Sequence, residues 1–178
     1  MTKQIYVING PNLNMLGIRE PHIYGHNTLQ DVQDLCELTA KALGAEVVFH
    51  QSNVEGELIN WIQEARTAAC ALIINAASLT HSSIGIYDAL KALDIPIIEV
   101  HLSNPHARED FRHKSYVSPV AFGVVAGFGI QSYRLAIDGL RGKRWLFKWN
   151  LKTALDSFLG RAIYPFKRFH LNGLRSMF

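Results

Sequence analysis

The sequence predicts an α/β protein built on a doubly wound, five-stranded parallel sheet with helices on both faces. Short β-rich runs alternate with longer segments of helical period along residues 4–141, which is the order found in parallel α/β folds. The β-rich runs are continuously apolar, as expected of strands that are covered on both sides. With 178 residues, 48% of them hydrophobic and 19% charged, the chain can bury one ordinary core.

Each element follows from its own pattern. The first helix is expected over residues 28–43, because Thr28 can cap its start and Gly44 stands where a helix end belongs. The expected strands are the apolar runs 5–9, 46–51, 71–75, 96–101 and 121–126. The other expected helices are 55–69 and 82–93, which carry apolar residues at helical spacing, and 129–140.

The composition favours a soluble protein of the reducing cytoplasm. The two cysteines, Cys36 and Cys70, have no motif spacing, so neither a disulfide scaffold nor a zinc site is expected. No apolar run approaches the roughly 18 residues of a membrane span. An apolar strand begins directly after the first three residues, so we expect no cleaved signal.

Parallel sheets of this kind bind ligands at the carboxyl ends of their strands, so the loops there are the first candidates for a site. The loop after the first strand runs from Asn9 to Gly25, and structured loops of that length usually act as lids or binding elements. Turn formation explains Asn9 and Asn14 equally well. A turn needs neither Arg19 nor Tyr24, which are therefore the stronger candidates.

The loop after the third strand carries Asn75 at the strand tip and His81 before the next helix. Both are expected to face the same crevice, although an incidental surface position is the plain alternative for His81. Thr80, Ser82 or Ser83 can cap the following helix, which accounts for these hydroxyl groups. The start of that helix also favours an anionic ligand.

The loop after the fourth strand begins with two side chains on one face of the strand. Glu99 and His101 are two residues apart, so they point the same way. A carboxylate next to an imidazole fixes its tautomer and suits it to act as a general acid or base. Arg108 and Arg112 are four residues apart and are expected on one short helical turn. Ion pairing at the surface with acidic neighbours such as Glu109 is the plain alternative for both arginines.

The same loops argue against several kinds of chemistry. The segment that begins at Asn9 does not match a glycine-rich phosphate loop, which disfavours a nucleotide or flavin cofactor. No cluster of Cys, His and carboxylate has metal spacing. Lys114 is the one lysine in these loops, so Schiff-base catalysis is not expected. The remaining Tyr, Arg, His and Asn side chains suit cofactor-free acid–base chemistry on a polyhydroxylated carboxylate, with an enolate stabilised by hydrogen bonds.

Six motifs in order carry a family resemblance: INGPNLNMLGIREPHIYG, QSNVEGELINWI, INAASLTHSS, DAL, IIEVHLSNPHAREDFRHKSYVSP and GVVAGFGIQSYRLA. Over roughly residues 4–141 the chain resembles type II 3-dehydroquinate dehydratase (type II dehydroquinase). The resemblance implies a lyase that converts 3-dehydroquinate into 3-dehydroshikimate, in the shikimate pathway to aromatic amino acids or in quinate breakdown. It also implies a flavodoxin-like, three-layer α/β/α fold, dodecamers built from trimers, and no cofactor, metal or Schiff-base lysine.

The resemblance implies catalytic roles for six side chains: Tyr24, Arg19, Arg108, His101, Glu99 and Asn12. Tyr24 matches the base that removes the proton next to the ketone. Lowering a tyrosine pKa from about 10 to neutrality needs about 3–4 kcal/mol, for which Arg19 is the implied source and Arg108 its support. His101 matches the acid that protonates the leaving hydroxyl, with Glu99 as its partner.

The remaining implied roles concern the substrate and the neighbouring subunit. Asn12 resembles the residue that holds a water against the enolate oxygen. The groups implied to hold the substrate's hydroxyls and carboxylate are the side chains of Asn75, His81 and Arg112 and the backbone N–H groups of Leu102 and Ser103. Asp88 resembles an acid that reaches the site of the next subunit in the trimer. Many family members have Arg before this acid, whereas this chain has Tyr87, so the ion pairs across the trimer are expected to differ.

Residues 1–141 are thus expected to form the catalytic domain, and residues 142–178 a basic, aromatic-rich extension that is partly helical. The extension holds eight of the 18 Lys and Arg residues, one of the 15 acids and eight of the 18 aromatic residues. We expect it to pack on its own subunit or to bridge neighbours. The alternatives are contact with an anionic membrane surface, nucleic-acid binding, which is not expected, and an unpacked tail.

The main alternative for the catalytic domain is a flavodoxin-like binding or regulatory protein that has lost catalysis. The combination of Arg19, Tyr24 and His101 argues against that alternative. The expected partners are therefore the small molecule 3-dehydroquinate and further copies of this chain.

Overall fold

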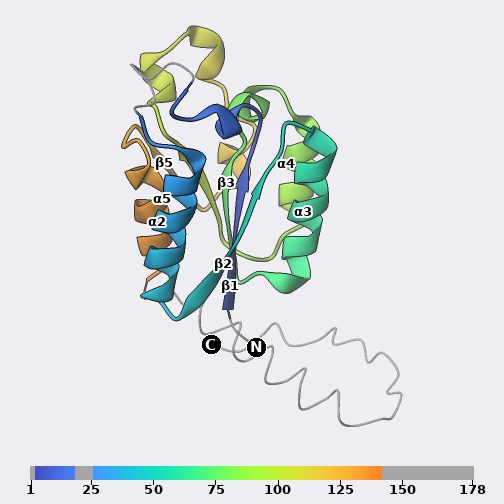
Figure 1. The fold of residues 1–178 in the computed structure, drawn as a ribbon. Helices are drawn as coiled ribbons and strands as arrows, with labels where there is room; N and C mark the ends of the chain where they lie inside the picture. Colours follow the sequence, from blue (N-terminus) through green and yellow to red (C-terminus); the bar gives the residue numbers. More distant parts are fainter. Residues whose placement is uncertain (1–2, 19–25, 142–178) are drawn as a thin grey trace, which may run out of the picture.

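The computed structural model describes residues 3–18 and 26–141, and this part of the chain forms three layers, α/β/α (Figure 1). The strands are β1 (Lys3–Asn9), β2 (Ala45–Gln51), β3 (Ala71–Asn75), β4 (Ile97–His101) and β5 (Gly123–Ala126). The helices are α2 (Leu29–Lys41), α3 (Glu55–Ala68), α4 (Ile84–Lys91) and α5 (Gln131–Asp138). Helices α2 and α5 cover one face of the sheet, and α3 and α4 cover the other. The predicted fold class is confirmed, and every strand and helix predicted for these residues is present.

All neighbouring strands are parallel, in the order β2-β1-β3-β4-β5. The chain leaves β1 for β2 on one side and then crosses to β3 on the other, so the topological switch point lies between β1 and β3. Strands β1, β3 and β4 are neighbours, which confirms that the three predicted loops leave one edge of the sheet. In the β1–β3 register, Asn9 lies opposite Asn75.

The core has two halves, one on each face of the sheet. In β1, Ile5 and Val7 point into the half under α2 and α5, whereas Tyr6 and Ile8 point into the half under α3 and α4. Alternation of this kind follows from the pleat of a strand. It explains why the strands read as continuous apolar runs, since each fully buried aliphatic side chain stabilises the fold by about 1.5–3 kcal/mol.

The helix ends follow the predicted signals with small shifts. Thr28 caps α2 through a reciprocal pair of hydrogen bonds with Asp31, and Gly44 adopts a φ of +68° just beyond the helix. Ser83 caps α4 by accepting from the Ile86 backbone N–H. The helix expected from residue 82 therefore begins two residues later, because the preceding segment Ala77–His81 forms a separate 3-10 helix, η2.

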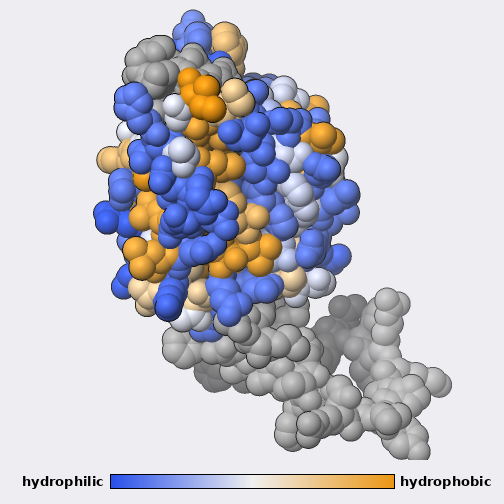
Figure 2. Space-filling view, viewed as in Figure 1, coloured by the Kyte–Doolittle hydropathy of each residue, from blue (hydrophilic) through white to orange (hydrophobic). Residues whose placement is uncertain are grey.

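The surface in Figure 2 carries polar side chains over the helices and an apolar band on the face where β2 lies in Figure 1. Val47, Val48 and Phe49 of this edge strand are only partly buried. In the described ranges, no helix has the length and apolar character needed to cross a membrane. The predictions for Arg19, Tyr24 and the extension 142–178 fall outside the described residues.

Candidate active site

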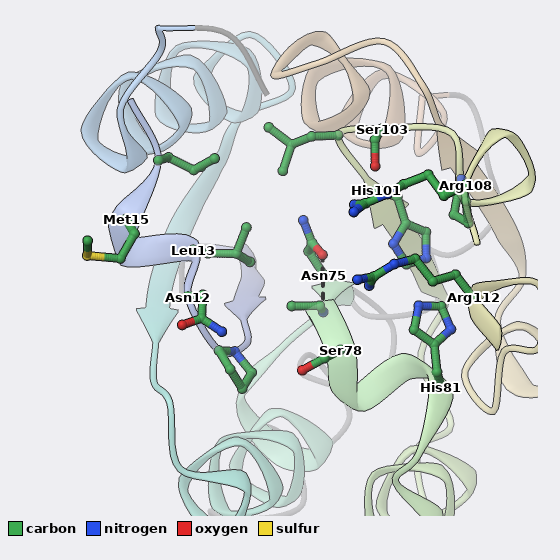
Figure 3. Close-up of a pocket in the computed structure, with 15 residues that line it drawn as sticks. Asn12, Leu13, Met15, Asn75, Ser78, His81, His101, Ser103, Arg108 and Arg112 are labelled. Carbon is green, nitrogen blue, oxygen red and sulfur yellow. Dashed lines mark hydrogen bonds between the residues drawn. The ribbon is translucent and has the colours of Figure 1, made fainter. Parts of the chain in front are cut away.

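A pocket opens at the carboxyl edge of the sheet, where the loops after β1, β3 and β4 meet (Figure 3). It encloses about 150 Å³. Its lining consists of Pro11, Asn12, Leu13, Met15, Leu16, Asn75, Ala77, Ser78, His81, His101, Leu102, Ser103, Pro105, Arg108 and Arg112. All of these residues come from the three loops that the sequence singled out.

Eight of the predicted site residues line this pocket: Asn12, Asn75, His81, His101, Leu102, Ser103, Arg108 and Arg112. Glu99 lies behind His101, and Asp88 lies exposed on α4, apart from the lining. Arg19 and Tyr24 fall outside the described residues. Asn14 is exposed and does not line the pocket, whereas Asn9 is fully buried below it.

His101 ends β4, and its imidazole is anchored to Glu99 on the same face of the strand. Nε2 of His101 lies 2.8 Å from Oε1 of Glu99, and Glu99 is only 1% exposed. Ser115 donates a hydrogen bond to Oε1 at 2.8 Å, and Ser118 donates to Oε2. Burial by itself raises the pKa of Glu99, but the hydrogen bonds from His101 and the two serines outweigh it and hold this pKa below its ordinary value. The carboxylate behind the pocket is therefore ionised.

Both histidines of the pocket are held through one ring nitrogen. An ionised Glu99 can only accept, so Nε2 of His101 carries a hydrogen and Nδ1 is the ring nitrogen left for a ligand. Nδ1 of His81 lies 2.8 Å from the backbone oxygen of Lys114, so it too must donate, and Nε2 is left for a ligand. The two rings stack at an interplanar angle of 11°, with centroids 6.5 Å apart (Figure 3).

Two arginines make the same side of the pocket cationic. Nε of Arg112 donates to Oε2 of Glu109 at 2.8 Å, and Nε of Arg108 lies 3.5 Å from the same oxygen. A hydrogen bond from its own backbone N–H, and then the bond from Arg112, lower the pKa of Glu109. Surface ion pairing was the alternative to a site role for these arginines, and the structure shows that they pair with Glu109 and line the pocket at the same time. One carboxylate thus orients two cations, and Figure 3 shows both beside His101.

The prediction that Arg108 and Arg112 share one helical turn is wrong. Two short 3-10 helices, η3 (Pro105–Ala107) and η4 (Asp110–Arg112), lie on either side of a break. Arg108 (φ −118°, ψ −164°) and Glu109 (φ −63°, ψ 141°) have extended backbone angles. An extended link between the two turns cannot continue the helical hydrogen bonds, and it brings both guanidinium groups to Glu109.

The floor of the pocket is built from the ends of β1 and β3. Asn75 is 2% exposed, and the Gly10 backbone N–H donates to the backbone oxygen of Asn75 at 2.8 Å. Ala77 has a φ of +52°, a left-handed conformation that costs a residue with a side chain about 1–2 kcal/mol. Asn12 has a φ of +67°, which asparagine tolerates, and its N–H donates to Asn53 at 2.8 Å. The floor is therefore a close-packed and partly strained junction.

Sequence reasoning missed three residues that support the site, Ser115, Ser118 and Tyr133, and it named Glu109 only as one of several acids that could pair with the arginines at the surface. The hydroxyl of Tyr133 lies between Asn9 and Asn75 beneath the floor. A tyrosine on an apolar helix face is a usable signal, because a buried hydroxyl needs a polar partner. Nothing in the local sequence marks the two serines or singles out Glu109 among its acidic neighbours.

The pocket lining offers cations, imidazoles, amides and backbone groups, and it includes neither lysine nor cysteine. Within residues 3–18 and 26–141, no three His, Cys, Asp or Glu side chains gather in a way that could hold a metal ion. The arrangement can bind an anionic, hydroxylated molecule and can move protons at His101 and His81.

The fold and the pocket together define a flavodoxin-like α/β enzyme whose candidate site lies at the switch point of its sheet. A family model described as dehydroquinase class II matches residues 3–141. The chain belongs to the class II dehydroquinase family.

Named relatives and solved structures agree. A 3-dehydroquinate dehydratase from Phenylobacterium zucineum is 63% identical over 142 residues, covering 80% of this chain and 98% of that protein. One from Caulobacter sp. (strain K31) is 60% identical, covering 80% and 97%. The type II dehydroquinase structure from Propionibacterium acnes has a TM-score of 0.74 at 45% identity, covering 79% of this chain and 97% of that one. The one from Butyrivibrio crossotus has a TM-score of 0.76 at 43% identity, covering 79% and 99%.

Proposed function

We propose that the chain dehydrates 3-dehydroquinate to 3-dehydroshikimate. The observation that carries this proposal is the buried Glu99–His101 pair, which stands in a cationic pocket at the switch point of the sheet. The proposed substrate is an anion with several hydroxyl groups and a ketone, and the pocket offers groups that complement each of these. The relatives named as 3-dehydroquinate dehydratases support the same substrate.

The proposed reaction is a two-step elimination. Tyr24 removes a proton from the carbon next to the ketone, and the electron pair of that C–H bond forms an enolate. A water held by Asn12 donates a hydrogen bond to the enolate oxygen. The enolate then collapses to a new C=C bond as the C–O bond to the neighbouring hydroxyl breaks. His101 protonates that hydroxyl from Nδ1, and it leaves as water.

The binding roles are proposed from the resemblance together with the lining. Asn75, His81 and Arg112 hold the hydroxyl groups, and the backbone N–H groups of Leu102 and Ser103 hold the carboxylate. The presence of all five residues in the lining of one pocket supports this arrangement. The cation of Arg112, fixed by Glu109, favours a negatively charged ligand.

The proposed chemistry needs no Schiff base and no metal. Neither the pocket lining nor the segment 19–25 contains a lysine. Arg19 and Arg108 are proposed to lower the pKa of Tyr24, because a nearby cation favours the phenolate over the phenol.

We propose that the enzyme works in the cytoplasm, in the shikimate pathway or in quinate breakdown, as a dodecamer built from trimers. Asp88 is proposed to serve the site of a neighbouring subunit, and its exposed position on α4, outside the pocket of its own chain, supports this. Residues 1–141 are the proposed catalytic domain and 142–178 an extension that packs within the assembly. Light scattering on the full chain and on a 1–141 truncation measures both masses, and a monomer in both would contradict the proposed assembly.

The first prediction tests the reaction by following the absorbance of 3-dehydroshikimate. Wild type should turn over 3-dehydroquinate, and Tyr24→Phe should lose at least about 10²-fold in kcat, because a phenyl ring cannot accept a proton. Tyr6→Phe is the matched control, since its hydroxyl donates to Glu64 and Tyr6 does not line the pocket. An inactive wild type that still binds substrate favours the binding-protein alternative. An unchanged Tyr24→Phe rate would overturn the assignment of the base.

A further inference from the structure

Beneath the pocket floor, four hydrogen bonds run in one line from β2 through β1 and α5 to β3. Asn9 Nδ2 donates to the His50 backbone oxygen at 2.9 Å, and the Tyr133 hydroxyl donates to Asn9 Oδ1 at 2.7 Å. Asn75 Nδ2 donates to the Tyr133 oxygen at 2.9 Å, and the Ala77 N–H donates to Asn75 Oδ1 at 3.2 Å. The three side chains are at most 2% exposed. We call this line the floor relay.

The floor relay has one direction, because both of its ends are backbone groups. The His50 carbonyl can only accept, so Asn9 must turn its NH₂ group toward it and present Oδ1 to the tyrosine. The Ala77 N–H can only donate, so Asn75 must turn Oδ1 toward it and present Nδ2. The Tyr133 hydroxyl satisfies both asparagines, since it donates to one and accepts from the other.

We propose that Tyr133 is a positioning residue that, together with the Ala77 N–H, sets which atoms of the Asn75 amide meet the substrate. This inference rests on the proposed function, in which Asn75 binds a substrate hydroxyl. Tyr133 accepts one of the two Nδ2 hydrogens of Asn75, and the Ala77 N–H uses one of the two lone pairs of Oδ1. The second Nδ2 hydrogen and the second Oδ1 lone pair are therefore left for a ligand. Tyr133 does not line the pocket, so it acts through Asn75 alone.

The surroundings keep the Tyr133 hydroxyl protonated. Its side chain is fully buried in the core under α5, and burial raises the pKa of Tyr133 well above its ordinary value. A phenolate there could not donate to Asn9, so the direction of the floor relay would be lost. The neutral hydroxyl is thus maintained by the same packing that holds the ring.

The test is a mutant cycle on kcat and KM for 3-dehydroquinate. Tyr133→Phe keeps the ring but leaves Asn9 Oδ1 and Asn75 Nδ2 without their partner, so kcat/KM should fall about tenfold, mainly through KM. Tyr6→Phe is the matched control, because Tyr6 is likewise buried, at 2% exposed, and its hydroxyl donates to Glu64 at 2.9 Å. Tyr6→Phe should stay within about twofold of wild type in kcat/KM at a comparable loss of stability.

Combining Tyr133→Phe with Asn75→Ala distinguishes a positioning role of Tyr133 from a merely structural one. If Tyr133 acts through Asn75, the double variant should be no worse than Asn75→Ala alone, whereas independent effects would multiply. If wild type is active but the losses in kcat/KM of the two single variants multiply in the double variant, the positioning role is overturned. It is also overturned if Tyr133→Phe and Tyr6→Phe have the same kcat/KM. In both cases the dehydratase proposal stands. An inactive wild type overturns the dehydratase proposal and this inference with it. If Tyr133→Phe does not fold, Asn9→Ala replaces it in the cycle with the same expected outcomes.

Discussion

Glu99 shows how a single side chain prepares the pocket for proton transfer. Its carboxylate is buried, which would ordinarily favour the neutral acid, yet three donors keep its pKa low. An ionised Glu99 cannot donate, so it selects the His101 tautomer with hydrogen on Nε2. The same carboxylate also stabilises the imidazolium form of His101, which carries the Nδ1 proton that the proposed role delivers.

Glu99→Gln is predicted to lower kcat by about 10²-fold or more, because a neutral amide cannot stabilise the imidazolium form of His101 that delivers the proton from Nδ1. The pH profile of kcat should change as well, which a purely structural defect would not produce. Glu57→Gln is the control, since Glu57 also accepts from a serine, Ser52, but is not bonded to His101. Equal pH profiles for Glu99→Gln and wild type would contradict this role.

At the level of elements, Gly10 lets the ends of β1 and β3 approach each other. A Cβ built at this glycine would lie 2.5 Å from the Ala76 backbone oxygen, closer than any ordinary contact. The atom it would meet is backbone, which cannot rotate away as a side chain can. The loops on both sides of the floor therefore depend on the absence of a side chain at Gly10.

Gly10→Ala is predicted to destabilise folding by about 1–3 kcal/mol and to lower kcat/KM, because it pushes the two strand ends apart. Gly56→Ala is the matched control: it lies in α3, has no atom within 4 Å of its added Cβ, and should stabilise by about 0.5–1 kcal/mol. Urea unfolding measures both free energies. A neutral Gly10→Ala would show that the junction can widen without loss.

The elements themselves were predictable because their signals are local. Thr28 and Gly44 bound α2 as expected, and the apolar runs became strands because both faces of this sheet are covered. The pocket edge was predictable for the same reason, since parallel topology brings strand ends together. The floor relay was not predictable from the sequence, because Tyr133 and Asn9 are 124 positions apart and only packing makes them neighbours.

At the scale of the whole molecule, the partly buried His50 and the buried Glu99 are predicted to make folding stability fall in two steps as the pH is lowered. Burial of His50 against Trp61 lowers the pKa of His50 below its ordinary 6.5, so the unfolded chain binds a proton first and stability declines below that pH. The pKa of Glu99 lies below its ordinary 4.5, so a second decline begins there.

Urea midpoints measured between pH 7 and pH 3.5 test the two steps. His50→Phe keeps the ring stacked on Trp61 and should flatten the decline below pH 6.5, whereas Glu99→Gln should flatten the one below pH 4.5. Each variant serves as the control for the other. A wild-type midpoint that rises on acidification would contradict the assigned signs.

The floor relay also affects the chemical stability of Asn9 toward deamidation. Asn9 is followed by Gly10, the pair of residues at which an asparagine most readily cyclises onto the next backbone nitrogen and deamidates. In the folded chain the Gly10 N–H is held by Asn75 and both ends of the Asn9 amide are bonded, so the nitrogen and the carbonyl carbon are kept from reacting. An aspartate formed while the chain is unfolded would present an acceptor to the His50 carbonyl, so damaged chains would refold with a broken relay.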